Sequence, residues 1–128
     1  MITEDYVSYE IAKLLKEKGF NEKVDTFYKM DAEFLKSTLC INYNDVKFAL
    51  LDMHNIPENT VSAPTLQMAM KWLREIHNID ISVTPDRKAG YSVLIFKAKR
   101  LPFYTLDSYS IYEEACEAAI KYCLENMI

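Results

Sequence analysis

Two histidines and three cysteines are the side chains of this chain best suited to acid–base or nucleophilic chemistry. His77 follows Leu73 by one turn on the apolar side of a helical pattern, which is typical of a packed, hydrogen-bonded histidine. His54 lies in a polar loop with no neighbour that the sequence fixes. A Cys–His pair works only where the two side chains are adjacent in space, and no spacing here predicts that. We expect no catalytic residue and predict that the protein is not an enzyme.

The cysteines Cys40, Cys116 and Cys123 fall on apolar positions, where thiols are usually inert. Cys116 and Cys123 are about 10 Å apart along one helix, too far for a disulfide. An odd cysteine count without secretory features indicates reduced thiols in a cytoplasm. There is no Cys-x-x-Cys and no paired histidine, so we expect no metal site.

Acidic side chains gather at the start of the last helical segment, in Glu113, Glu114 and Glu117. Ser110 and Glu113 have the spacing of a capping box, with Ser110 as N-cap. The other carboxylates favour the positive end of the helix dipole. The chain has only two glycines, which leaves no glycine-rich loop to bind phosphate. We therefore expect no cofactor.

A helix over residues 63–78 is the clearest element that must position these side chains. Its N-cap is Ser62 or, alternatively, Thr65, and Asn78 is suited to end it. The apolar arc is wider than a surface helix needs. Either this helix is covered on two sides, or Met68 and Trp72 form a contact surface for another protein. The main apolar stripe consists of Leu66, Ala69, Met70, Leu73, Ile76 and His77.

The other segments predict an α+β fold. Helices are expected over about 8–18, with Asp5 or Ser8 as N-cap, and over about 111–127. Hairpins are expected over about 25–41 and 79–98. The complete expectation is a single domain over 1–128, in the order α-ββ-α-ββ-α, with an antiparallel sheet packed against the helices.

Three further segments have less regular patterns. Val46–Met53 fits either a short helix or a buried strand. Tyr91–Ala98 is apolar on both faces, which is typical of a central or doubly covered strand. Leu101–Leu106 fits a short edge strand, where Pro102 is tolerated.

The net charge of −4 and the pI near 5.2 argue against a dedicated DNA-binding protein. The second hairpin is nevertheless basic. Beside Tyr91 and Phe96, its cations would suit single-stranded nucleic acid, bound by stacking and charge. The alternative is that they decorate a turn and protect a strand edge. The basic residues are Arg87, Lys88, Lys97, Lys99 and Arg100.

No secretory or membrane segment is expected from the sequence. Met1–Asp5 is acidic rather than basic and leads into a polar stretch, unlike a signal peptide. No apolar run approaches the roughly 20 residues that a membrane span requires.

Three blocks of the sequence form a distinctive set: SYEIAKLLKEKGF (Ser8–Phe20), SAPTLQMAMKWLREIHNI (Ser62–Ile79) and YEEACEAAIKYCLENMI (Tyr112–Ile128). In these blocks the chain resembles a group of short proteins of uncharacterised function. That group is encoded by phages, prophages and other mobile elements of gut anaerobic bacteria. The resemblance implies an accessory protein in a bacterial cytoplasm, and it implies no reaction, ligand or partner. Residues 21–61 depart most from the pattern.

Together these observations favour a non-enzymatic protein-interaction module that binds another protein or itself, through Met68 and Trp72. The alternative function is nucleic-acid binding through the basic hairpin Arg87–Arg100.

Overall fold

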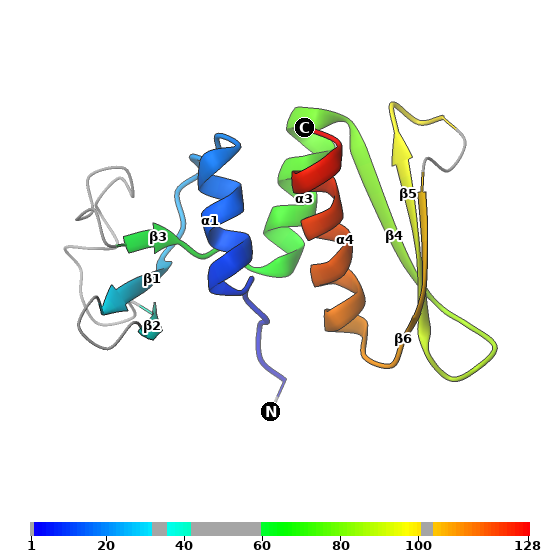
Figure 1. The fold of residues 1–128 in the computed structure, drawn as a ribbon, viewed down its shortest axis with the longest axis horizontal. Coiled ribbons are helices and arrows are strands. Elements are labelled where there is room, and N and C mark those ends of the chain that lie inside the picture. The colour runs from blue at the N-terminus through cyan, green and yellow to red at the C-terminus, as the bar shows by residue number, and fades with distance from the viewer. Residues whose placement is uncertain (1, 32–35, 42–59, 101–103) are drawn as a thin grey trace. The chain divides into compact units, whose positions relative to one another are not determined.

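The computed structural model describes residues 2–31, 36–41, 60–100 and 104–128 (Figure 1). The fold is α+β, and the predicted order of helices and hairpins is confirmed, with two further strands. Contacts group the chain into two compact units, Tyr6–Pro64 and Met1–Asp5 with Thr65–Ile128. The single domain expected over residues 1–128 stays a prediction. No helix in the described ranges is long and apolar enough to cross a bilayer.

Helix α1 (Tyr9–Glu17) belongs to the unit Tyr6–Pro64. Ser8 is its N-cap, and the Ser8 hydroxyl accepts a hydrogen bond from the Ile11 N–H at 3.3 Å. Gly19 takes a φ of 92°, which glycine adopts without strain, and the Phe20 N–H returns to the Leu15 carbonyl at 2.9 Å. The helix thus begins and ends where the sequence predicts.

The first predicted hairpin is confirmed in β1 (Thr26–Asp31) and β2 (Lys36–Ile41), which pair antiparallel. A third strand, β3 (Thr60–Ser62), pairs with the other side of β1. Sequence reasoning missed β3 because three residues carry no readable alternation. The Tyr28 hydroxyl donates to the Val7 carbonyl at 2.7 Å and ties β1 to the chain before α1. Val46–Met53 lies outside the described residues.

The second predicted hairpin is also confirmed, in β4 (Ile79–Pro85) and β5 (Tyr91–Lys97). Strand β6 (Tyr104–Tyr109) extends this sheet to the order β4-β5-β6, so β5 is central, as its apolar faces predict. In the turn, the Asp86 carboxylate accepts from the N–H groups of Lys88 and Gly90 at 2.8 and 2.9 Å. A Cβ at Gly90 would lie 2.8 Å from the Tyr109 carbonyl oxygen, so glycine lets the strands approach. The described strands therefore form two three-stranded sheets rather than the single sheet that the sequence predicts.

Helices α3 (Leu66–His77) and α4 (Tyr112–Asn126) cover one face of the β4-β5-β6 sheet (Figure 1). Between helices and sheet lies a core of fully buried side chains. The sheet-covering role of α3, expected from its apolar arc, is thereby confirmed. The largest members of this core are Leu73, Ile79, Val93, Ile95, Ile120 and Leu124.

The helix starts correct two sequence expectations. Thr65, not Ser62, is the N-cap of α3, and its hydroxyl accepts from the Met68 N–H at 3.0 Å. The N-cap of α4 is Ile111, whose side chain makes no capping bond, so the predicted Ser110–Glu113 capping box is wrong. Ser110 lies one residue too early, and Glu113 instead sits in the first turn, where the helix dipole favours a carboxylate.

Candidate functional site

The two residues predicted to contact a protein differ in exposure. Met68 is 39% exposed, whereas Trp72 is only 5% exposed. The Trp72 ring packs edge-on against His77, with ring centroids 4.7 Å apart. The expectation that Trp72 belongs to a contact surface is therefore corrected, because the indole is part of the core. Conversely Ile76, placed on the buried stripe by its spacing, is 58% exposed in the last turn of α3.

His77 is a poor candidate for acid–base catalysis. Its Nε2 atom is buried and has no hydrogen-bond partner in the described part of the chain, so the predicted hydrogen-bonded histidine is not found at this nitrogen. Burial, and then the positive charge of Lys97, lower the pKa of His77 below its usual 6.5. Burial and the positive charge of Lys97 thus both disfavour the protonated imidazole.

The two described thiols are fully buried, at 0% exposure for Cys116 and Cys123. Burial raises the pKa of Cys123 to about 12. Burial also raises the pKa of Cys116, assisted by the charge of Glu113, against an opposing hydrogen bond with Tyr112. Neither is a thiolate near neutral pH, which a nucleophile requires. The side chain of Cys40 lies outside the described residues.

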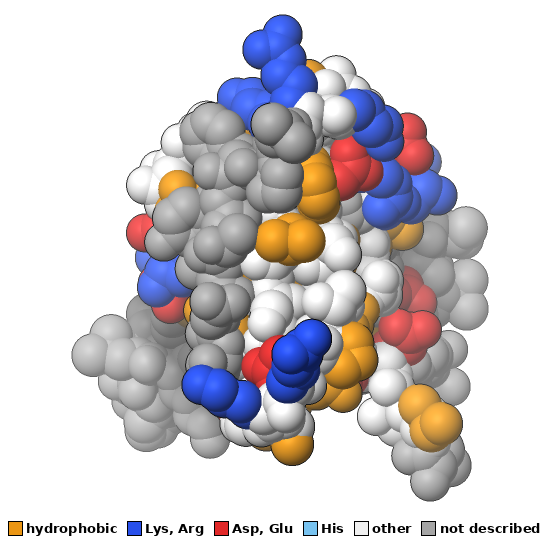
Figure 2. Space-filling model, turned by 90° about the vertical axis from the view of Figure 1, so that its right-hand side faces the viewer, with side chains coloured by type: hydrophobic (Ala, Val, Ile, Leu, Met, Phe, Trp, Pro, Cys, Tyr) orange, Lys and Arg blue, Asp and Glu red, His pale blue; other side chains and the backbone are white. Residues whose placement is uncertain are grey.

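The predicted basic hairpin places its cations at two opposite ends. Arg87 and Lys88 are exposed in the turn before β5, and the other three follow at the far end of that seven-residue strand, about 20 Å away. Figure 2 views the sheet from the side away from α3 and α4, and blue side chains gather near opposite ends of this face. The separation arises because strand β5 extends the chain between the two groups.

Two of the three cations at the far end, Lys97 and Lys99, are also engaged within the protein. The Lys97 ammonium donates to the Met127 carbonyl at 3.2 Å, so it lies on the helix-covered face of the sheet. The Lys99 ammonium forms an ion pair with Asp80 at 3.2 Å. A nucleic-acid strand bound along the open face would therefore contact few cations that are not already engaged within the protein.

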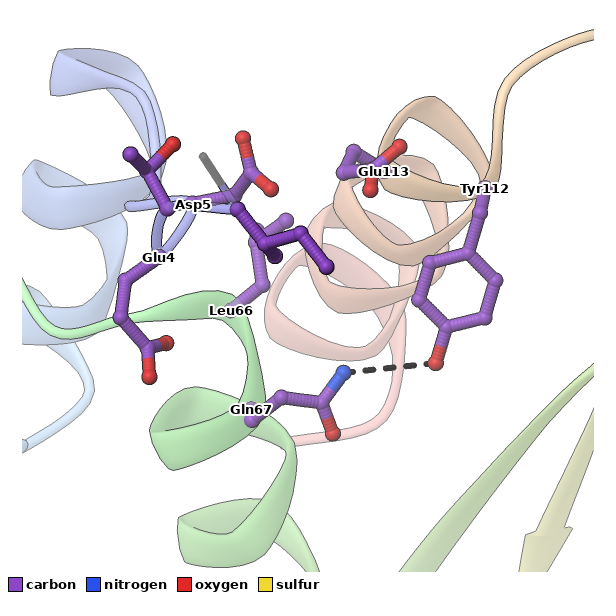
Figure 3. Close-up of a pocket in the computed structure, with 8 residues that line it drawn as sticks. Glu4, Asp5, Leu66, Gln67, Tyr112 and Glu113 are labelled. Carbon is purple, nitrogen blue, oxygen red and sulfur yellow. Dashed lines mark hydrogen bonds between the residues drawn. The ribbon is translucent and has the colours of Figure 1, made fainter.

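A cavity of about 300 Å³ lies at the start of α3 and α4 (Figure 3). Gln67 and Tyr112 point toward each other across it, and the Gln67 amide nitrogen lies 3.3 Å from the Tyr112 hydroxyl. The N-terminal segment forms another wall, fixed by the Leu66 N–H, which donates to the Asp5 carbonyl at 2.9 Å. The complete lining is Ile2, Thr3, Glu4, Asp5, Leu66, Gln67, Tyr112 and Glu113.

The chemistry of this cavity is limited. Its carboxylates, from Glu4, Asp5 and Glu113, are not among any described group of three or more ligands that could hold a metal ion. The Gln67 hydrogen bond favours the Tyr112 phenolate, but burial, the Cys116 thiol and Glu113 outweigh it and raise the Tyr112 pKa above 10.0. The phenol is therefore a weak acid, and the lining offers neither histidine nor cysteine as a catalytic base or nucleophile.

Strand β4 lies at an edge of its sheet, where no described strand pairs with the outer side of its backbone; sequence reasoning did not identify this edge. The Ala98 N–H donates to the Asn78 carbonyl at 2.8 Å, and the Asp86 N–H donates to the Gly90 carbonyl at 2.9 Å. Hydrogen-bonded pairs alternate along an antiparallel ladder. In the register of β4 and β5, the backbone of even-numbered residues therefore faces β5. Within the described chain, the backbone groups of Ile79, Ile81 and Val83 face away from β5 and pair with no other strand.

Two apolar side chains of β4, Ile81 and Val83, are only partly covered. Ile81 and Val83 lie opposite Ile95 and Val93, which are both 0% exposed. Ile81 and Val83 themselves remain partly exposed, although they point to the same helix-covered face. A further strand at this edge would pair with the outward backbone groups and cover the partly exposed apolar side chains.

No protein-family model, no curated protein and no solved structure matches the chain.

Proposed function

We propose that this protein is a non-enzymatic protein-interaction module and that the β4 edge is its contact element. The observation that carries this proposal is the outer side of β4, where no strand of the described ranges pairs with the backbone beside the partly exposed Ile81 and Val83. A bound strand would satisfy the backbone groups and bury the two apolar side chains in one step.

The β4 edge lacks the usual devices that prevent strand addition. Natural edges are commonly protected by lysine, proline, a bulge or very short length. Strand β4 has seven residues, pairs with β5 without a register shift, and carries Asp80 as its one charged residue, with proline only at its last position. By contrast, β3 has only three residues, and the β5–β6 pairing contains an irregularity between Tyr91 and Val93. Among the described strands, β4 is thus well suited to receive a partner.

The other two functions have weaker support. An enzyme would need an activated group, but the two described thiols are buried with raised pKa values, and the buried Nε2 atom of His77 has no hydrogen-bond partner among the described residues. Nucleic-acid binding would need a continuous basic surface, and the cations of the hairpin are divided between its ends. The resemblance to phage and mobile-element proteins adds the proposal of an accessory role in the cytoplasm of a bacterial host.

Site-specific photo-crosslinking in cells tests the proposal. A photoreactive amino acid replaces Ser82, which is partly exposed on β4, or Glu125, which is exposed on α4 of the same unit. We expect covalent protein adducts from position 82 and few from position 125. Equal labelling at both positions, or none at position 82, contradicts the proposal.

A further inference from the structure

We infer that the open face of the β4-β5-β6 sheet, which points away from α3 and α4, receives an amphipathic helix of a partner protein that carries acidic side chains at both of its ends. This surface differs from the β4 edge, so the inference goes beyond the proposed function and does not depend on it. With the partner helix bound, the sheet lies between two helical layers, as sheets in α/β proteins commonly do.

The central strand β5 carries apolar side chains on the open face as well as on the covered one. Val93 and Ile95 point to the helices and are fully buried, so Leu94 and Phe96, which alternate with them, point to the open face. Both remain partly exposed, and Figure 2 shows hydrophobic side chains near the middle of this face. A sheet face that meets water is usually polar. Leu94 and Phe96 therefore indicate that an apolar element covers this face.

The spacing of these two side chains suits a helix that runs along the strand. Leu94 and Phe96 are two residues apart on β5, which is about 7 Å. Residues four apart on one side of a helix are about 6 Å apart along its axis. On the neighbouring strand β4, the side chain opposite Leu94 is the small Ser82, which lets a helix backbone approach. One apolar stripe of a helix can therefore contact both residues.

The two ends of the open face are basic, which defines the charge of the partner. Arg87 and Lys88 are exposed in the turn before β5, and Arg100 is exposed beyond its far end. Among the described residues, none of these three forms an ion pair. Lys99 also reaches over this face, because its ammonium contacts Asp80 while its side chain stays 77% exposed. The two basic ends are about 20 Å apart, the length of about 13 residues of helix. Carboxylates in the first and last turns of such a helix would meet both ends.

Other occupants fit this surface less well. The apolar stripes of α1 and α4 are buried within the chain itself, so these helices of a second copy offer no apolar side to the open face. Helix α3 exposes the apolar Met68, but beside Lys71 and Arg74, whose charges would repel the basic ends. A nucleic-acid strand needs cations along its path rather than only at two ends. An acidic amphipathic helix of another protein satisfies both the apolar middle and the basic ends.

Selection from a phage-displayed library tests the inference on the full chain. The library presents helices of about 16 residues, long enough to span both basic ends, with randomised outer positions. Leu94→Glu places a carboxylate in the middle of the open face, and Met68→Glu makes a matched change on α3, where Met68 is 39% exposed. We expect helices with an apolar stripe and acidic end turns, which Met68→Glu retains and Leu94→Glu loses. Circular dichroism checks that both variants are folded, and Leu94→Ser replaces Leu94→Glu if the latter is not.

The charge requirement is measured with the most enriched helix as a labelled synthetic peptide, by fluorescence anisotropy. A contact of this size predicts a dissociation constant of about 10 μM to 1 mM. The double variant Arg87→Glu and Arg100→Glu should bind at least about tenfold more weakly and with a weaker dependence on salt. The double variant Lys71→Glu and Arg74→Glu reverses the same number of charges on α3 and should bind like the unmodified protein.

Three results overturn the inference: no enriched helix, enriched helices without acidic end turns, or equal losses in the variants of the open face and of α3. Single-stranded RNA that binds in place of any helix, and is released by the Arg87→Glu and Arg100→Glu variant, overturns it in favour of nucleic acid. NMR separates this surface from the β4 edge. A helix on the open face should shift the methyl signals of Leu94 and leave amide exchange of Ile81 and Val83 rapid, whereas a strand at the edge should slow that exchange.

Discussion

Ile81 and Ile95 face each other across β4 and β5, yet Ile95 is fully buried and Ile81 remains partly exposed. Both point to the face that α3 and α4 cover. The difference arises because β5 has neighbours on both sides, whereas β4 has one described neighbour. Among the described residues, apolar side chains therefore remain partly exposed along the outer edge of β4. The proposed function is based on this edge.

Trp72→Ala should destabilise the fold by roughly 3–5 kcal/mol, because it removes a buried indole and its contact with His77. Met68→Ala on the same helix is the control, and a side chain that is 39% exposed should cost much less. Urea denaturation measures the stability of both variants. Circular dichroism is the signal, because Trp72 is the one tryptophan of the chain and the Trp72→Ala variant has no tryptophan fluorescence. Equal losses of stability would contradict the burial described above.

Thr65→Ala should cost about 1 kcal/mol of stability, because the Thr65 hydroxyl caps α3 through the Met68 N–H at 3.0 Å. Ser110→Ala should be nearly neutral, because Ile111 and not Ser110 is the N-cap of α4. The midpoints of urea denaturation of the Thr65→Ala and Ser110→Ala variants, each compared with the unmodified protein, test this prediction. A larger effect at Ser110 than at Thr65 would restore the capping box that the sequence suggested.

Cys116 and Cys123 should react with a thiol reagent only as fast as the protein opens. Both are fully buried, and the pKa of each is raised by burial, to about 12 for Cys123, so a moderate increase in pH produces little thiolate. The measurement is absorbance with a chromogenic disulfide on a Cys40→Ser variant, in buffer and in denaturant. Native labelling at the rate of free cysteine would revive a nucleophilic role.

The protein should show no measurable binding to single-stranded RNA in fluorescence anisotropy. The cations at the two ends of the second hairpin are about 20 Å apart, and Lys99 is held by Asp80. Charge reversal at Arg87, Lys88, Lys97 and Arg100 should therefore leave the signal unchanged. Micromolar, salt-sensitive binding that this reversal abolishes would favour the nucleic-acid alternative instead.

Elements with a regular pattern were predictable from the sequence. The alternation of Ile79, Ile81 and Val83 predicts β4, and the helical spacing after Thr65 predicts α3, because each pattern reports which side chains one element buries. Strand β3 was not predictable, since three residues hold no period and its place depends on β1.

Site-level predictions were less accurate for a physical reason. Angular position on α3 puts Ile76 among the buried residues, but the last turn leaves it exposed, while Trp72 is covered. Exposure depends on which elements lie above a given turn, and no single helix pattern contains that information. The β4 edge escaped detection for the same reason, because alternation identifies a strand without saying how many neighbours it has.

Backbone amide exchange along β4 tests the central claim most directly. In dilute protein, the N–H groups of Ser82 and Thr84, which face β5, should exchange slowly, whereas those of Ile81 and Val83 should exchange rapidly. Rapid exchange of Ile81 and Val83 beside slow exchange of Ser82 and Thr84 is the result that an open β4 edge predicts. Protection of all four N–H groups at every dilution would show that the β4 edge is already covered and would contradict the account.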